Sequence, residues 1–221
     1  LPGRAPARAA VRDIVVARST DRGATWSAPV RVHADGWVFD GCPHAGPSLQ
    51  VDDAGRVHVA WWTGREGAAG VYYARSDDGR RFGPPVALGT AAFSRPAHVQ
   101  LALGRDARSL PTVVVAWDDG TRRVPQIVLR ASGDGGRRFG APVAVSEAGR
   151  SAAFPVLALD RRGALLVAWA EQSPRVAAEA ARRRPDMRDP SARMPLARVG
   201  ESHVVVRRGT EYYDRRVIAA E

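Results

Sequence analysis

The sequence of 221 residues contains no lysine and no asparagine, and it has only one cysteine. All 33 basic side chains are therefore arginines, and with 23 acidic residues they leave a net charge of +10. This bias is typical of a GC-rich coding sequence, because the codons for lysine and asparagine are rich in A. The arginines are scattered among predicted turns and form no stripe with aromatic residues. We therefore expect no nucleic-acid partner, and an anionic ligand fits the charge better.

Other features are missing as well. The single Cys42 excludes an internal disulfide framework. No long apolar run is present, so we expect no transmembrane segment and no membrane partner. The sequence shows neither a signal peptide nor an initiator methionine. We therefore expect a mature or trimmed product, and the lack of a targeting segment is compatible with a secreted or periplasmic protein.

A hairpin motif occurs three times, and its first serines are 57 and 56 residues apart. Ser and Asp oxygens can cap the N–H groups of a tight turn, Gly takes a positive φ, and the aromatic residue is expected to seal the hairpin. Each copy follows a β-rich run and precedes a proline and a second short strand. The residues of the three copies are Ser19, Asp21, Gly23 and Trp26; Ser76, Asp78, Gly79 and Phe82; and Ser132, Asp134, Gly136 and Phe139.

Further short strands separate the hairpins, and three of them contain Val-Ala-Trp, ending at Trp61, Trp117 and Trp169. A period of this size with four strands per unit predicts an all-β propeller of four-stranded antiparallel blades. The blades are predicted at roughly 11–33, 47–88, 97–145 and 155–221, with a part-helical insertion at 171–201. This is about three and a half blades. Missing upstream blades or a second chain are expected to cover the open edges.

The hairpin closely resembles the Asp box (BNR repeat) of the sialidase superfamily, Ser/Thr-x-Asp-x-Gly-x-x-Trp/Phe. The second copy has one residue fewer between Asp78 and Gly79. The resemblance implies a six-bladed parent, an exo-α-sialidase-type glycoside hydrolase, and an anionic carbohydrate as partner. It also implies that the boxes are structural and that the site lies on the face opposite them.

On that face the resemblance and the loop positions suggest one site. Asp40 is the candidate catalytic acid, Arg95 and Arg150 are candidate clamps for a sugar carboxylate, and Trp37 and Trp62 are flanking apolar walls. The family also uses a Tyr nucleophile, but the tyrosines here are predicted in a third strand and in the last hairpin turn, at Tyr72, Tyr73, Tyr212 and Tyr213. Enzyme activity therefore stays open. The alternative is a non-catalytic binding or scaffold propeller that keeps its boxes only for structure.

No cofactor and no metal are expected. A weaker alternative is a soft-metal site of Cys42 and His44, with Met187 and Met194 on the same face, because these ligand types suit copper. The competing interpretation makes Cys42 a small buried hydrophobe and lets His44 donate to a backbone carbonyl. The other histidines are expected as core or blade-face residues, at His33, His58, His98 and His203.

Overall fold

A computed structural model describes residues 10–39, 45–90, 96–106, 109–121, 123–172 and 202–209. The regular structure in these ranges is β-strand, and none of it is a helix long and apolar enough to cross a membrane. The strands are β1 (Val15–Val16), β2 (Val30–Arg31), β3 (Ser48–Val51), β4 (Val57–Thr63), β5 (Gly70–Ser76), β6 (Val86–Thr90), β7 (Val99–Arg105), β8 (Pro111–Asp119), β9 (Gln126–Ser132), β10 (Val143–Ala144), β11 (Ser151–Leu159), β12 (Leu165–Gln172) and β13 (Ser202–Gly209).

The strands form four antiparallel sheets in which neighbours in sequence are neighbours in space. We call them the first blade (β1–β2), the second (β3–β6), the third (β7–β10) and the fourth (β11–β13). The second and third blades have four strands, as the sequence predicts. β12 continues to Gln172, so the first two residues of the insertion predicted at 171–201 belong to this strand, and the rest of that insertion lies outside the described residues.

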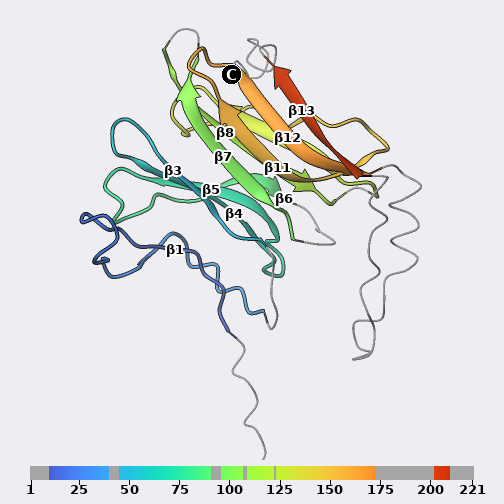
Figure 1. Cartoon of the computed structure of the whole chain (residues 1–221). Helices are drawn as coiled ribbons and strands as arrows, with labels where there is room; N and C mark the ends of the chain where they lie inside the picture. The colour runs from blue at the N-terminus through green and yellow to red at the C-terminus, as the bar shows by residue number, and fades with distance from the viewer. Residues whose placement is uncertain are drawn as a thin grey trace, which may run out of the picture.

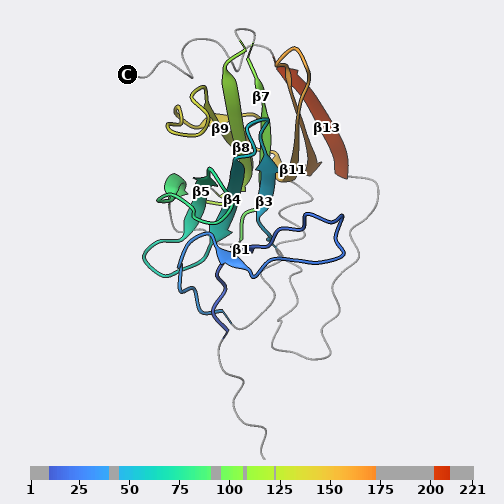
Figure 2. The same cartoon turned by 90° about the vertical axis from the view of Figure 1, so that its left-hand side faces the viewer.

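Successive blades contact each other through their innermost strands. β3, the innermost strand of the second blade, contacts β7, and β7 contacts β11. Figures 1 and 2 show the sheets following one another from the blue first blade to the orange and red fourth blade. Contact between successive innermost strands is the arrangement of a β-propeller, of which these residues form a part.

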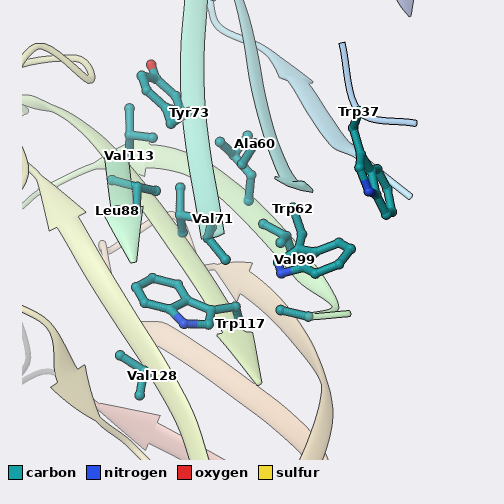
Figure 3. Packing of buried hydrophobic residues seen from close by; sticks show 13 residues of the cluster. Trp37, Ala60, Trp62, Val71, Tyr73, Leu88, Val99, Val113, Trp117 and Val128 are labelled. Atoms are coloured by element: carbon teal, nitrogen blue, oxygen red, sulfur yellow. The ribbon is translucent and has the colours of Figure 1, made fainter. Parts of the chain in front are cut away.

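The core lies between blades, and the tryptophan of each Val-Ala-Trp strand faces the preceding blade. Trp61 packs in a cluster with Val32 of the first blade, and Trp169 packs in a cluster with Ile127 of the third. Trp117 lies among residues of the second blade, including Val71 (Figure 3). All three indoles are at most 2% exposed. Each buried side chain of this size stabilises the fold by about 1.5–3 kcal/mol, so the blades are joined mainly by apolar contact.

The three Ser/Asp/Gly hairpin motifs, which we call boxes, share one set of hydrogen bonds. In each, the glycine N–H donates to the serine Oγ, and the serine hydroxyl donates to the aspartate. The Ser–Gly bonds are Ser19–Gly23 at 2.7 Å, Ser76–Gly79 at 2.8 Å and Ser132–Gly136 at 2.9 Å. The Ser–Asp bonds are Ser19–Asp21, Ser76–Asp78 and Ser132–Asp134 at 2.7, 3.1 and 2.8 Å. The shorter second box therefore keeps the pattern by moving the glycine one residue closer to the serine. The glycine φ is positive in all three, from +70° to +92°.

The box aspartates are held as carboxylates by the turn itself. The side chain and backbone N–H of Thr25 donate to Asp21 and lower its pKa to about 2. The backbone N–H groups of Arg80 and Arg81 donate to Asp78 and lower its pKa as well. These bonds satisfy N–H groups that the turn would otherwise leave unpaired.

The box aromatics do not all seal their hairpins as predicted. Phe139 packs edge-on against Tyr73 of the preceding blade, with ring centroids 5.0 Å apart. Phe82 packs against the Trp61 cluster. Trp26, however, is 65% exposed, so the prediction is wrong for the first box. The reason is that these aromatics pack on the preceding sheet, and among the described residues no sheet precedes the first blade.

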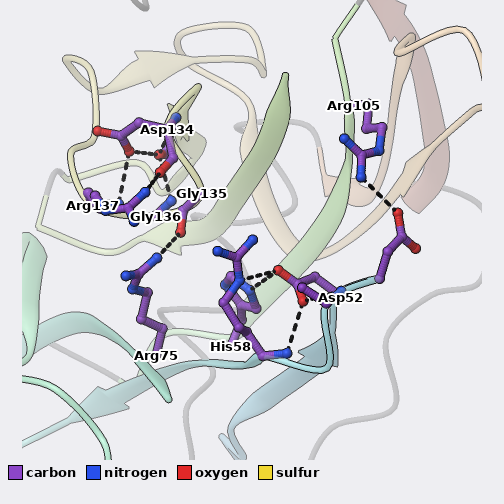
Figure 4. Close-up of polar contacts among 12 residues, drawn as sticks. Asp52, His58, Arg75, Arg105, Asp134, Gly135, Gly136 and Arg137 are labelled. Carbon is purple, nitrogen blue, oxygen red and sulfur yellow. Dashed lines mark hydrogen bonds and ion pairs between the residues drawn. The ribbon is translucent and has the colours of Figure 1, made fainter. Parts of the chain in front are cut away.

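The third box is fastened to the second blade. Arg75 of β5 donates from Nη1 to the Gly135 carbonyl at 3.1 Å (Figure 4). The β3–β4 turn lies at the same end, where Asp52 accepts hydrogen bonds from Arg56 and His58. The box turns and the turns between first and second strands therefore share one end of the molecule, which we call the box face. Connections between blades, and those between second and third strands, lie at the opposite face.

Candidate functional site

Trp37 and Trp62, predicted as walls of a site, do come together near the opposite face. Their rings meet edge-on with centroids 5.1 Å apart (Figure 3). Phe39 stacks on Trp37 with ring centroids 5.0 Å apart. A Cβ on Gly64 would meet both indoles, at 2.6 Å from Trp62 and 2.9 Å from Trp37. Both indoles are at most 9% exposed. The pair therefore belongs to the core between the second and third blades and presents little ring surface to a ligand.

Arg150, the second candidate clamp, lies in the connection from β10 to β11, at the opposite face. Its guanidinium is engaged by two carboxylates, with Nη1 3.2 Å from Glu171 and Nε 3.5 Å from Glu147. Glu171 is buried near the end of β12 and also accepts from the Trp169 indole at 3.2 Å. The arginine side chain remains 42% exposed. A guanidinium has five N–H donors, so this one is oriented by its partners and can still donate to an outside acceptor.

Six other residues predicted for a site lie outside the described part of the chain: Asp40, Arg95, Cys42, His44, Met187 and Met194. Within the described ranges, no group of three or more His, Cys, Asp or Glu residues is arranged to hold a metal ion.

A second buried carboxylate occurs at the same face in the first connection between blades. Asp35 is 5% exposed and accepts the Trp61 indole N–H at 2.9 Å. Burial raises its pKa, although the hydrogen bond from Trp61 and the nearby His33 oppose this. Arg65 donates to the Asp35 backbone carbonyl at 3.4 Å. Asp35 and Glu171 thus play the same part, since each accepts a hydrogen bond from the indole of a core tryptophan.

The described tyrosines are both engaged in the second blade. The Tyr72 hydroxyl donates to the Ala68 carbonyl at 2.8 Å. The Tyr73 hydroxyl is 2.6 Å from Nδ1 of His58, and Tyr73 is 1% exposed. Burial raises the pKa of Tyr73 above its ordinary value. The Tyr73 side chain is thus buried toward the box face, whereas the Tyr72 hydroxyl lies toward the opposite face and is bonded to the β4–β5 connection.

The structure also reveals a polar group that the sequence analysis did not single out. Asp118 is fully buried near the end of β8 and accepts from the His98 backbone N–H at 2.7 Å and from His98 Nδ1 at 2.8 Å. Its Oδ2 also accepts the Phe154 backbone N–H from the fourth blade at 3.3 Å. The His98 ring lies 4.3 Å from the Phe154 ring. A histidine held this way by a carboxylate has a fixed tautomer and one outward nitrogen that can accept a proton or a hydrogen bond.

One sequence signal could have revealed this group. The residue after the tryptophan of Val-Ala-Trp is Trp62 in the second blade, Asp118 in the third and Ala170 in the fourth. A carboxylate in a position that is otherwise apolar, inside a strand buried on both faces, requires a partner. The partner His98 was expected only as a core or blade-face residue, and the structure places it just before β7 with its side chain 23% exposed.

No family model matches the sequence, and no curated protein matches it either. Solved structures are similar in fold. One is a PL25 ulvan lyase bound to a GlcA(1-4)Rha3S saccharide, with a TM-score of 0.50, 14% identity, and coverage of 73% of this chain and 41% of that one. Another is a protein of unknown function from Dyadobacter fermentans, with a TM-score of 0.49, 19% identity, and coverage of 76% of this chain and 54% of that one. A third is the Penicillium chrysogenum α-L-arabinanase complexed with arabinobiose, with a TM-score of 0.46, 15% identity, and coverage of 72% of this chain and 51% of that one. The chain thus spans about two fifths of the ulvan lyase and shares its β-propeller fold over part of the ring.

Proposed function

We propose that this chain is part of a secreted or periplasmic sialidase-like propeller whose site for an anionic carbohydrate lies opposite the box face. The observation that carries the proposal is the Asp box. Three copies repeat the same Ser–Gly and Ser–Asp hydrogen bonds, and the third is fastened to the preceding blade at the box face. Because these turns are structural, they leave the opposite face for a ligand. The fold shared with the ulvan lyase supports a carbohydrate ligand.

Arg150 supports the anionic character of that ligand. Its known bonds use Nε and Nη1, so further N–H groups can donate to a sugar carboxylate. The carboxylates of Glu147 and Glu171 already neutralise part of its charge, so we expect Arg150 to hold a sugar carboxylate more weakly than Arg95 does. Arg95, in the preceding connection between blades, is the stronger candidate by sequence, and Asp40 remains the candidate acid.

The test is calorimetric titration of N-acetylneuraminic acid and of galactose into the intact chain. Replacing Arg95 by Ala is expected to weaken binding of the acid by about 1.5–3 kcal/mol, the range for a charge-assisted hydrogen bond. Galactose binding should hardly change. Arg162→Ala is the matched control, because it removes the same charge from the exposed β11–β12 turn at the box face. Equal affinity of the wild-type chain for both sugars would contradict the anionic site.

A second function, binding without catalysis, is favoured by the tyrosines. Both described tyrosine hydroxyls are hydrogen-bonded within the second blade. The chain would then bind N-acetylneuraminic acid without releasing the fluorophore of a fluorogenic sialoside. Release that is lost in Asp40→Asn would instead support the hydrolase.

A further inference from the structure

We propose that His98 and Phe154, positioned by Asp118, form a sugar-binding subsite at the junction of the third and fourth blades. In this subsite the Phe154 ring stacks on the apolar face of a pyranose, and Nε2 of His98 accepts a hydrogen bond from one of its hydroxyls. The inference rests on the proposed carbohydrate function and deepens it, because it names the residues that contact the sugar ring. It does not depend on the sugar being charged.

The first support is the way in which Phe154 is presented. Its side chain is 56% exposed, near the start of an innermost strand at the face opposite the boxes. Its φ is +58°, in the left-handed region that non-glycine residues rarely adopt, and the β11–β12 register shifts between Ala153 and Val156. Backbone strain and bulges of this kind are concentrated at ligand sites, where they re-aim a side chain. Here they direct a large aromatic ring away from the core.

The second support is the orientation of His98. A carboxylate only accepts hydrogen bonds, so the 2.8 Å contact to Asp118 places the hydrogen on Nδ1 of His98. In neutral His98 this leaves the lone pair on Nε2, and no residue in the described ranges is hydrogen-bonded to that atom. The His98 side chain is 23% exposed. Because Nδ1 is held by Asp118 and part of the side chain is exposed, Nε2 is a pre-oriented acceptor.

The two rings form one surface of suitable chemistry. Their centroids are 4.3 Å apart and their planes are inclined by 49°. An apolar ring with one fixed polar atom at its edge is what a saccharide requires, since a pyranose has C–H groups on its faces and hydroxyls at its rim. Binding sites in general combine aromatic lining with few, precisely oriented polar groups.

The other blades show that the fold does not need this group. In the fourth blade, Ala153 and Ala170 are paired in register at the corresponding place. In the second blade, Trp62 follows the tryptophan where the third has Asp118. Both blades form the same strands without a carboxylate at this position. Burying a carboxylate is costly unless it is hydrogen-bonded, so its presence at this position in the third blade alone points to a use.

The experiment follows the side-chain ¹⁵N resonances of His98 in the intact chain at pH 8, where an ordinary histidine is neutral, while galactose or glucuronic acid is added. We expect the Nε2 resonance to move on binding while the resonances of His33 stay unchanged. His33 is the control because it also lies beside an aspartate, 3.9 Å from Asp35, on the same face. Calorimetry on Phe154→Leu is expected to show about tenfold weaker sugar binding, the worth of one aromatic contact. Calorimetry on His98→Gln is expected to show a loss of about fivefold, as for one neutral hydrogen bond.

The outcomes separate this inference from the proposed function. Sugar binding that leaves the His98 resonances and both variants unaffected would overturn the subsite while the carbohydrate function stands. Binding of both sugars with these effects, but without preference for the acid, supports the subsite and contradicts the anionic site. No binding of either sugar at tens of millimolar would overturn both.

Discussion

The Tyr73 side chain occupies the space that a Cβ at Gly136 would need. Such an atom would lie 2.6 Å from Cζ of Tyr73 and would collide with its hydroxyl oxygen. The third box can therefore close over the second blade only with glycine at this position. Its φ of +84° independently favours glycine.

We expect Gly136→Ala to destabilise the chain by about 2–4 kcal/mol, because backbone strain and overpacking against a buried ring add together. Urea unfolding measures the effect. Gly23→Ala is the matched control, since Gly23 has a similar φ of +92° but its nearest new neighbour would be Trp26 at 4.0 Å. Gly23→Ala should lower the free energy of unfolding by about 1 kcal/mol, from backbone strain alone. Equal costs for the two variants would mean that contact with Tyr73 is unimportant.

The box aromatics allow a second comparison. Phe139 packs on Tyr73, whereas Trp26 at the same motif position is 65% exposed. We expect Phe139→Ala to cost about 2–3 kcal/mol and Trp26→Ala less than about 0.5 kcal/mol, because only the first leaves a cavity. Thermal unfolding of both variants checks this. A large loss for Trp26→Ala would show that it is covered in solution, for example by a second copy of the chain.

The hairpins and blades could be predicted from the sequence because their determinants are local. Each box is defined within eight residues, and the strands alternate with turns at a regular period. The exposure of Trp26 could not be predicted, since it depends on a neighbouring sheet and not on the motif. The group around Asp118 could not be predicted either. Its partners are 20 residues away in His98 and 36 residues away in Phe154, and only blade packing brings them together.

The free energy of unfolding should decrease in acid in two steps, one from His58 and one from its hydrogen-bond partner Asp52. Burial lowers the pKa of His58 below its ordinary 6.5, although the hydrogen bond and charge of Asp52 oppose this. The unfolded chain therefore binds a proton that the folded chain does not, and stability falls as the pH drops below about 6.5.

Burial alone would raise the pKa of Asp52, but hydrogen bonds from Arg56 and His58 outweigh it and lower the value to about 2. A second loss follows as the pH falls from about 4 towards 2.

Urea unfolding between pH 5 and 8 measures the first of these steps. His58→Phe removes the titrating group, so the variant should lose less stability than the wild type over this interval. His33→Gln, which changes a histidine that is about one-third exposed, should keep the wild-type dependence. A His58→Phe profile parallel to that of the wild type would assign the step to other residues.

The equivalent tryptophans Trp61 and Trp117 differ in what their indole N–H groups meet. Trp61 donates to buried Asp35 at 2.9 Å, whereas Nε1 of Trp117 has no hydrogen-bond partner within the described part of the chain. Both indoles are at most 2% exposed, so Phe substitutions leave similar cavities and lose similar apolar contact. Trp61→Phe also leaves a buried carboxylate with one donor fewer, which costs about 1–3 kcal/mol. Trp117→Phe removes a donor that makes no hydrogen bond within the described part of the chain. We therefore expect Trp61→Phe to be the more destabilising by about 1–2 kcal/mol in urea unfolding. If Trp117→Phe costs as much, its indole must donate to a group beyond the described residues.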